Sequence, residues 1–526
     1  MSALPAFLLE DEGGGEHSFP GARPALICFV KEDCPTCNDI VPLVEALYRE
    51  LGVAADFFVV GQTSDGNQVL KERHGLTVPL LDDESLKVSF AYDVEIVPTL
   101  HLVDAKGQST AKLVGFARDE WQEGAEGFAR ALNLAPLSLD WADYPEWRPG
   151  CGSRSADPLI ADRLRAESEN SPLRARRIEV GAGDDEVELM FDLGFSDGLP
   201  LVPPTPERVL RMLGGTGRDA QEVVATVPPN MGEATVEKIA INAVMAGCRP
   251  EYLPVVIACM EAVCTDEFNI HGVMATTMGA SPVIVVNGPV RERLGMNMKL
   301  GALGQGSRAN ATIGRALRLA IRNIGGARPG GTERSTLGNP MKFTMCFPEW
   351  EERNPWTPLH VERGFAAGDS VVTAFAMSSG PTLMVDQDAR NGDHLAGSLG
   401  LCLDSIFHPR AHFATETLLV IAPEHVDTFA RDGYGKAEIR ARIQAVTARS
   451  IQELAADEVS AVGFKPAVVE AMDEQARARK LPKFRRDEDI HIVVAGAEAG
   501  KFSGAFHGWV TGEIGSMPVS KVIEEA

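Results

Sequence analysis

The segment from Ala25 to Cys37 is ALICFVKEDCPTC, an apolar run followed closely by two cysteines that are separated by a proline and a threonine. The apolar run, residues 25–30, has the length and composition of a buried strand. The residues after it, 38–51, place apolar side chains at helical spacing, so the cysteines lie where a helix begins. Farther along, Ile96-Val-Pro-Thr99 leads into a second apolar run. Together these signals predict two thiols at a helix N-terminus with a proline facing them.

The periodicity from residue 25 to about residue 132 alternates between strand and helix. It predicts further strands over 55–60, 99–104 and 112–116, and helices over 67–74, 83–92 and 120–132. This order resembles the thioredoxin superfamily, and most of all its TlpA/thioredoxin branch. The motifs that carry the resemblance are Cys34-Pro-Thr-Cys37 at the first strand-to-helix junction and Val97-Pro-Thr99 before the hairpin. The resemblance covers residues 25–133 and implies a thioredoxin-like fold there.

The resemblance also implies a role for each residue of these motifs. Cys34 would be the exposed nucleophile, Cys37 the buried resolving thiol, and their redox disulfide the cofactor of the domain. Pro98 would be cis and would contact the substrate. The physical chemistry agrees, because free N–H groups and the dipole at a helix N-terminus stabilise a thiolate.

The chain departs from the family pattern at three places. Pro35-Thr36 stands between the cysteines where Gly-Pro is usual. Asp33 replaces a frequent tryptophan and opposes a thiolate, and Lys31 partly offsets that charge. Cys28 stands where the family has a buried acid that accepts a proton. A thioredoxin fold kept only as a docking module is therefore the alternative to redox activity.

The chain has 526 residues and a net charge of −24. This length predicts about three domains, and we expect an α/β protein. Its parts would be a thioredoxin-like domain over 1–136, a linker over 137–183, a large α/β domain with the active site over 184–416, and an α/β extension of that domain over 417–526. The acidic balance argues against nucleic acid as a partner. No apolar window has membrane length, and the N-terminus lacks an export pattern.

Nine scattered cysteines, an odd number, favour a reducing cytoplasm over a disulfide scaffold. One of them, Cys151, lies in the Pro-, Trp- and Gly-rich junction and is followed by a glycine and a serine. It is a candidate to accept a disulfide from Cys34, and an ordinary linker thiol is the alternative.

The large region contains polar groups at the predicted ends of its elements. The run Gly301 to Thr312 places glycines before a helix, which indicates an anion site or a plain turn. His360 and Glu362 are predicted to alternate along an extended stretch, so His360 would be a base oriented by Glu362 or Asp393, or else a structural histidine. The candidate catalytic residues are Cys248, His271, Cys346 and His360, and the candidate substrate-binding residues are Glu233, Lys238, Asn287, Arg308, Asn310 and Arg315.

A metal site in this region is a further alternative, and no metal ligand set is predicted. Cysteine and histidine side chains are suitable ligands. His408-Pro-Arg-Ala-His412 has the spacing of a zinc-binding helix, but it contains a proline and lacks the glutamate of that motif.

Three phrases resemble an uncharacterised bacterial family that is found with UGSC-type selenoproteins. They are LPLVPPT at 199–205, GEATVEK at 232–238 and NAVMAGC at 242–248. The resemblance implies thiol chemistry. The UGSC motif is absent, because Cys151-Gly-Ser-Arg154 lacks its final cysteine.

Two enzymatic hypotheses about function follow, and a non-catalytic scaffold is a third possibility. In the first, the chain is a thiol-disulfide oxidoreductase whose Cys34–Cys37 pair supplies electrons to a fused catalytic domain. A cellular thiol reductant or a thioredoxin-reductase-type donor would reduce the pair. That domain would act on a small anionic or sulfur-containing substrate, with Cys248 or Cys346 as the receiving thiol. In the second, the chain is a non-redox lyase or hydrolase of a small anionic molecule, and the first domain only docks. The oligomeric state is left open.

Overall fold

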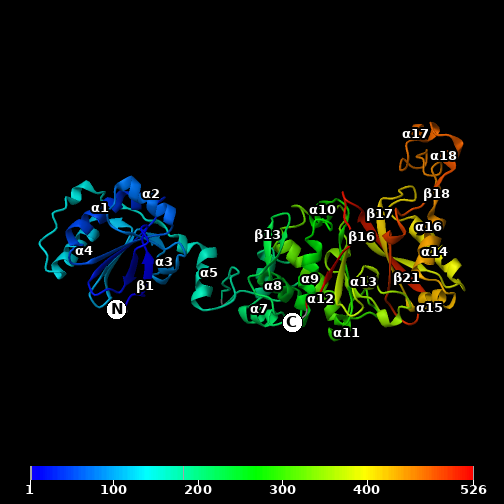
Figure 1. Ribbon diagram of the computed structural model, residues 1–526, viewed down its shortest axis with the longest axis horizontal. Coiled ribbons are helices and arrows are strands. Elements are labelled where there is room, and N and C mark those ends of the chain that lie inside the picture. The colour runs from blue at the N-terminus through cyan, green and yellow to red at the C-terminus, as the bar shows by residue number, and fades with distance from the viewer. Residues whose placement is uncertain (1–2, 182, 525–526) are drawn as a thin grey trace. The chain divides into compact units, whose positions relative to one another are not determined.

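The computed structural model describes residues 3–181 and 183–524, and the chain divides into two compact units with the boundary between Ile178 and Glu179 (Figure 1). The sequence predicted a linker over 137–183. Instead, this segment as far as Ile178 belongs to unit 1, because part of it pairs with that unit's strands. The aromatic, proline-rich residues there pack against one domain.

Unit 1 is built around a five-stranded sheet in the order β5-β4-β3-β7-β8. Strands β3, β4 and β5 are parallel to one another, β7 runs antiparallel to β3, and β8 runs antiparallel to β7. All six residues of β3 are buried, which is why its sequence is a continuous apolar run. The strands are β3 (Ala25–Val30), β4 (Asp56–Gly61), β5 (Leu80–Asp82), β7 (Thr99–Val103) and β8 (Ser109–Val114).

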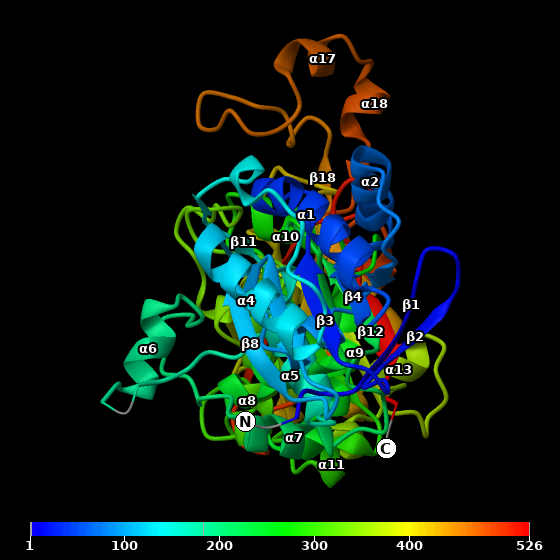
Figure 2. The same ribbon diagram turned by 90° about the vertical axis from the view of Figure 1, so that its left-hand side faces the viewer.

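Helices pack against this sheet, and Figure 2 shows β3 and β4 side by side with α1 at one end. The predicted elements of this domain are confirmed to within a few residues, except that the helix predicted over 83–92 is a single short turn. The helices are α1 (Pro35–Leu51), α2 (Ser64–His74), α3 (Lys87–Ala91), α4 (Arg118–Ala131) and α5 (Pro158–Ser168). The short strands are β1 (Phe7–Glu10), β2 (Glu16–Phe19), β6 (Ile96–Val97), β9 (Phe116–Ala117), β10 (Trp147–Arg148) and β11 (Cys151–Gly152).

Unit 2 contains a seven-stranded mixed sheet in the order β15-β14-β16-β21-β17-β20, with β22 also paired to β16. Strands from both predicted parts, 184–416 and 417–526, share this one sheet. Successive residues of β17 enter two different apolar clusters, so both faces of the sheet are covered. The strands are β14 (Ser281–Asn287), β15 (Cys346–Pro348), β16 (Val371–Val385), β17 (Thr415–Ile421), β20 (Ile490–Val494), β21 (Phe502–Val510) and β22 (Val519–Val522).

The helices of this part of unit 2 are α6 (Glu186–Asp192), α7 (Pro206–Leu213), α8 (Val236–Ala246), α9 (Leu253–Val263), α10 (Ile270–Ala275), α11 (Val290–Arg293), α12 (Arg308–Asn323), α13 (Leu359–Glu362), α14 (Gly392–Asp404), α15 (Pro423–Arg431) and α16 (Lys436–Thr447). Of these, α13, α14, α15 and α16 add residues to the two apolar clusters. A separate ribbon consists of β12 (Val223–Val227) and β13 (Gly232–Thr235). Across residues 3–181 and 183–524, no helix is long and apolar enough to cross a membrane.

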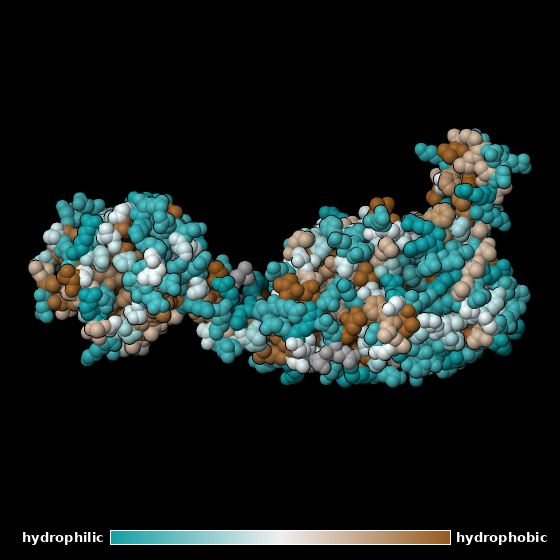
Figure 3. All heavy atoms as spheres, viewed as in Figure 1, coloured by the Kyte–Doolittle hydropathy of each residue, from teal (hydrophilic) through white to brown (hydrophobic). Residues whose placement is uncertain are grey.

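A small lobe stands away from the rest of unit 2 in both ribbon views (Figures 1 and 2). It consists of α17 (Pro466–Glu470) and α18 (Glu474–Ala478), and the paired strands β18 (Arg449–Ser450) and β19 (Lys480–Leu481) lie at its base. Its surface mixes apolar and polar side chains (Figure 3). The exposed apolar residues of this segment are Val459, Val462, Phe464 and Val468.

Candidate functional site

Cys34 and Cys37 lie at the N-terminus of α1, as the sequence predicted. Cys34 is the N-cap residue, and its Sγ accepts a hydrogen bond from the backbone N–H of Cys37 at 3.4 Å. The same Sγ lies 3.6 Å from the carbonyl oxygen of Val97. The peptide bond between Val97 and Pro98 is cis, which confirms the expectation for that proline. The loop before β7 therefore faces the two thiols.

Hydrogen bonding makes Cys34 the acidic thiol of the pair. The Cys37 thiol, the Cys151 thiol and the backbone N–H groups of Cys37 and Thr36 together lower the pKa of Cys34 from 9.0 to about 5, against the effect of burial. Burial, followed by hydrogen bonding to Cys34, raises the pKa of Cys37 well above its ordinary value. At neutral pH this arrangement holds a thiolate on Cys34 and a proton on Cys37, the states needed for attack and for later resolution.

The structure shows the surroundings of two residues that depart from the family pattern, Asp33 and Cys28. Asp33 forms an ion pair with Lys31 at 3.1 Å, so its charge is balanced beside the thiolate. Cys28 is fully buried in β3, and burial raises its pKa to about 12. A neutral thiol at this position carries no negative charge that would take a proton from Cys37.

Cys34 is not exposed, which corrects the expectation drawn from the resemblance. Its exposed fraction is 0%. The physical reason is the segment 147–155, here called the strap, which contains β10 and β11 and pairs with strands on either side of the thiols. Cys151 of the strap is close enough for its thiol to hydrogen-bond to Cys34. The sequence named Cys151 as a candidate partner of Cys34 but did not show that the strap covers the site.

The pH dependence of the Cys34 thiolate tests this electrostatic arrangement. Ultraviolet thiolate absorbance of the reduced chain, with Cys34→Ser as the reference, is expected to rise with a midpoint near pH 5. Cys151→Ala removes a donor and should move that midpoint upward, and Cys37→Ala should move it further. Because the folded pKa lies below the unfolded one, Cys34 stabilises the reduced fold above about pH 9, and this stability is lost as the pH falls toward 5. A midpoint that is unchanged in both variants would contradict the assignment.

In unit 2, two of the predicted residues converge on two carboxylates, of which Glu349 is buried and Glu351 is partly exposed. Asn287, at the carboxyl end of β14, donates from Nδ2 to Glu349 at 2.7 Å and to Glu351 at 2.9 Å. The Nδ1 atom of His360 lies 3.9 Å from Glu351. Arg291 on α11 contacts the same Glu351 at 3.1 Å. Neither carboxylate nor the arginine was predicted from the sequence, although all three come shortly after the carboxyl ends of β14 and β15.

The predicted orientation of His360 by Glu362 or Asp393 is wrong. The segment is a helical turn, α13, and not an extended stretch, so His360 and Glu362 do not share a face as predicted. Glu362 instead pairs with Lys436 at 2.8 Å and with Arg440 at 2.7 Å. His360 is fully buried, and within the described part of the chain neither of its ring nitrogens has a hydrogen-bond partner.

The residues predicted to bind an anion have structural contacts. Arg308 donates to the carbonyl oxygen of Gly247 at 2.9 Å. The side-chain amide of Asn310 is occupied by the Asn297 backbone and by Ala302 and Ser307. Arg315 donates from two side-chain nitrogens to the carboxylate of Asp197, at 2.8 and 2.9 Å. Asp197 lies in the segment that precedes α7. Lys238 donates to the backbone oxygen of Glu233 at 3.0 Å, so these two lie together at the start of α8.

The two predicted receiving thiols are both buried. Burial raises the pKa of Cys248 to about 12, and it raises the pKa of Cys346 above the range in which a thiol ionises. Both are therefore neutral thiols, and that of Cys248 donates to the Thr312 carbonyl oxygen at 3.3 Å.

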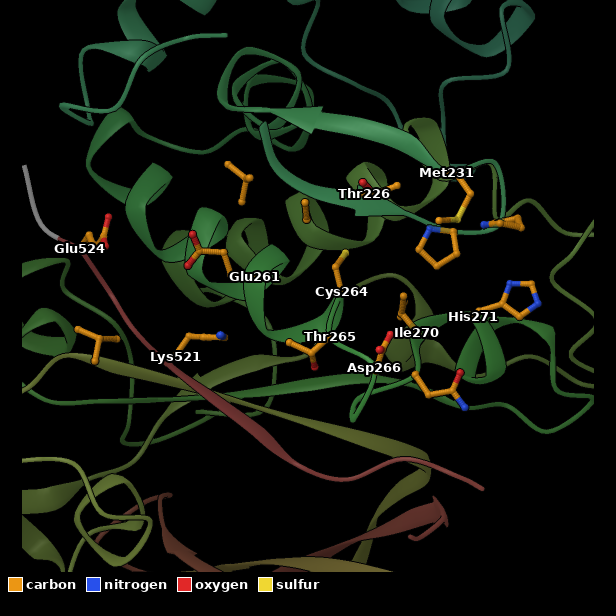
Figure 4. Close-up of a pocket in the computed structure, with 16 residues that line it drawn as sticks. Thr226, Met231, Glu261, Cys264, Thr265, Asp266, Ile270, His271, Lys521 and Glu524 are labelled. Atoms are coloured by element: carbon orange, nitrogen blue, oxygen red, sulfur yellow. The ribbon is translucent and has the colours of Figure 1, made fainter. Parts of the chain in front are cut away.

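His271 lines an open cavity of about 1020 Å³ between the β12–β13 ribbon, the end of α9, α10 and β22 (Figure 4). The close-up shows Cys264 in the middle of the lining, with His271 toward one end and Lys521 toward the other. Cys264 is half-buried, and burial raises its pKa to about 12. Cys264 and Lys521 were not predicted as site residues from the sequence, because only the fold brings the end of α9 close to β22. In the ranges 3–181 and 183–524, no group of three or more metal-ligating side chains is found.

Comparison with known proteins gives matches to the N-terminal part of the chain. The sequence model of the AhpC/TSA family matches residues 2–110. The thiol-disulfide oxidoreductase ResA of Geobacillus kaustophilus is 30% identical over 119 residues, which are 22% of this chain and 68% of ResA. The ResA of Geobacillus thermodenitrificans matches to the same extent. Among solved structures, StoA of Bacillus subtilis has 20% identity and a TM-score of 0.22, and the match covers 24% of this chain and 98% of StoA.

Proposed function

Because the chain belongs, through its N-terminal domain, to the AhpC/TSA thioredoxin-like family of thiol-disulfide oxidoreductases, we propose that Cys34 and Cys37 exchange electrons with a disulfide partner. The observation that carries this proposal is the hydrogen-bonded pair at the start of α1. It combines a thiolate of low pKa with a protonated thiol within the same turn.

The proposed reaction has two exchange steps. The Cys34 thiolate attacks one sulfur of a substrate disulfide, so that a mixed disulfide forms and the other substrate sulfur leaves as a thiolate. Cys37 then loses its proton and attacks the Sγ of Cys34. The Cys34–Cys37 disulfide forms, the substrate leaves as a dithiol, and two electrons have moved from the chain to the substrate. A cellular thiol reductant would return the pair to the dithiol state in a reducing cytoplasm, where scattered cysteines stay reduced.

Cys34→Ser is expected to lower the rate of reduction of a disulfide peptide, with dithiothreitol as electron donor, by at least about 100-fold, because the attacking thiolate is lost. Cys37→Ser should still form the mixed disulfide at Cys34, but it cannot resolve that mixed disulfide through a Cys34–Cys37 bond. Cys402→Ser serves as the matched control, since Cys402 is a half-buried thiol on α14 in unit 2. Equal loss in the Cys402 and Cys34 variants, or full activity in Cys34→Ser, would contradict the proposal.

We further propose that the thiol pair serves chemistry on a small molecule bound in unit 2. The open cavity supports this extension, because it presents Cys264, His271 and Lys521 together. Cys264 replaces the buried Cys248 and Cys346 as the better candidate for a receiving thiol. The second candidate function, a non-redox lyase or hydrolase in which unit 1 only docks, uses the same cavity with His271 as the base.

One experiment separates the two functions. The full chain and its variants are incubated with a cell extract of small metabolites, and the compounds consumed are identified by mass spectrometry. Consumption that is lost in Cys34→Ser/Cys37→Ser and in Cys264→Ala supports the redox coupling. Consumption that persists in both of these variants but is lost in His271→Ala supports the non-redox function. If His271→Ala and Cys264→Ala both leave consumption unchanged, the cavity is not the site of either.

A further inference from the structure

The strap pairs with other strands of unit 1 as an added strand. β11 pairs antiparallel with β6, so that Cys151 lies opposite Val97 and Gly152 opposite Ile96. The backbone N–H of Ser153 extends this ladder to the Glu95 carbonyl oxygen at 2.9 Å. An extended peptide that binds a protein in this way gains affinity from its backbone and specificity from its side chains.

The other end of the strap is held by a second short ladder. β10 pairs antiparallel with β9, so that Trp147 lies opposite Ala117 and Arg148 opposite Phe116. The hydroxyl of Thr36, one of the two residues between the active-site cysteines, donates to the Pro149 carbonyl oxygen. The strap is thus held by backbone contacts on both sides of Cys34.

Polar side chains hold the strap at the three residues that follow Cys151. Lys31 donates from Nζ to the Gly152 carbonyl oxygen at 3.1 Å. The buried side chain of Gln62 donates to the Ser153 hydroxyl at 2.6 Å and accepts from the backbone N–H of Arg154 at 2.9 Å. The side-chain amide of Gln62 therefore has a strap partner for both its N–H group and its oxygen. This pairing indicates a binding site formed for the strap, because leaving buried polar groups unpaired would cost free energy.

The residue before Cys151 must be small. A Cβ on Gly150 would lie 2.0 Å from Ile96 Cγ2 and 2.8 Å from the Val97 carbonyl oxygen. A Cβ on Gly152 would meet nothing within 4 Å. The groove beside Pro98 therefore accepts an extended strand of defined register. That strand needs a glycine before its cysteine, whereas the residue after the cysteine can carry a side chain.

We propose that the strap is a built-in substrate: it occupies the groove in which the cysteine-containing strand of a partner protein docks, and its Cys151 exchanges disulfides with Cys34. The partner is a protein that presents an extended Gly-Cys segment, which must displace the strap to reach Cys34. This proposal rests on the thiol reactivity of Cys34 proposed above.

The exchange balances without any further reagent. In the oxidised domain, Cys151 loses its proton to solvent and attacks the Sγ of Cys34. The Cys34–Cys37 bond breaks, the Cys34–Cys151 bond forms, and Cys37 leaves as a thiolate that takes up a proton. No electrons enter or leave, so the disulfide produced by the proposed activity is the only oxidant required. The reaction is reversible, because Cys37 can attack the new bond in turn.

The test uses the full chain with Cys37→Ser, which prevents the ordinary resolution, and oxidised glutathione as the probe. Glutathione first adds to Cys34 and releases one equivalent of reduced glutathione. Cys151 then displaces the bound glutathione and releases a second. We expect two equivalents per chain, above the background of a Cys34→Ser/Cys37→Ser chain, and a Cys34–Cys151 crosslink in peptide mass spectrometry. Cys37→Ser/Cys402→Ala, the matched control, should behave identically.

The possible outcomes distinguish the proposed role of Cys151 from the proposed thiol reactivity of Cys34. Cys37→Ser/Cys151→Ala should release half as much glutathione and retain one glutathione on Cys34. If Cys37→Ser itself retains glutathione on Cys34 with no crosslink, the role of Cys151 is overturned while the reactivity of Cys34 stands. If Cys37→Ser releases nothing above background, both proposals fail.

Discussion

Gly150→Ala is expected to raise the rate at which iodoacetamide alkylates Cys34 by roughly 10- to 100-fold. The added Cβ overlaps Ile96 and the Val97 carbonyl oxygen, and overpacking of this kind costs about 1–3 kcal/mol. Each 1.4 kcal/mol shifts the equilibrium between a closed and an open strap by about tenfold. Because Cys34 is fully covered in the closed form, its alkylation rate follows the open fraction.

Gly152→Ala is the matched control for this variant. It makes the same chemical change two residues away, where the new Cβ meets nothing within 4 Å, so the rate should stay within about twofold of the wild type. Both rates are measured by peptide mass spectrometry at a pH well above the pKa of Cys34, so that loss of the Cys151 hydrogen bond does not change the thiolate fraction. Equal rates in the two variants would show that the strap does not control access to Cys34.

Glu349→Ala is expected to lower the free energy of unfolding of unit 2 by about 3–5 kcal/mol, as for removal of one member of a buried charged network. The Glu349 carboxylate is fully buried, and burial raises its pKa. It accepts hydrogen bonds from Asn287 at 2.7 Å, from Asn354 at 2.7 Å and from the backbone N–H of Leu359 at 2.9 Å. Alanine leaves these donors unpaired inside the protein, and each such group is costly.

Glu352→Ala provides the comparison for Glu349→Ala. Glu352 pairs with Arg291 at 2.9 Å, but nearly half of its side chain is exposed, so its loss should cost less than about 1 kcal/mol. Urea dependence of amide hydrogen exchange, followed in peptides from β14 and β15, measures both changes without interference from unit 1. Equal destabilisation by the two variants would contradict the role assigned to Glu349.

Unit 1 was predictable because its signals are local. A buried strand, a helix N-cap and a hairpin turn are each encoded within a few residues, and β3, α1, β7 and β8 formed where their periodicity indicated. Cys34 and Cys37 needed nothing more than their place at the start of α1. The compensation of Asp33 by Lys31 was also predictable, because the two residues are neighbours in sequence.

The contacts of unit 2 were less predictable, since they join distant segments. Asn287 was recognised at the end of a buried strand, but its partners Glu349 and Glu351 follow the next strand of the sheet, more than fifty residues later. His360 was placed on an extended stretch, whereas tertiary packing made it part of a helical turn. Short segments of this kind have weak local preferences, so packing decides their conformation.

The amino-acid sequence by itself determined that this protein carries a thioredoxin-like pair of cysteines, because the strand, the helix start and the proline loop are specified by short-range patterns. Only the tertiary structure decided how accessible that pair is. The strap residues are an unremarkable Pro-Gly-Cys-Gly turn in the sequence, and their role comes from backbone pairing with β6 and β9, which lie many residues away. Pairing of this kind depends on the shape of the groove beside Pro98, and the groove exists only once the sheet and α1 have packed together.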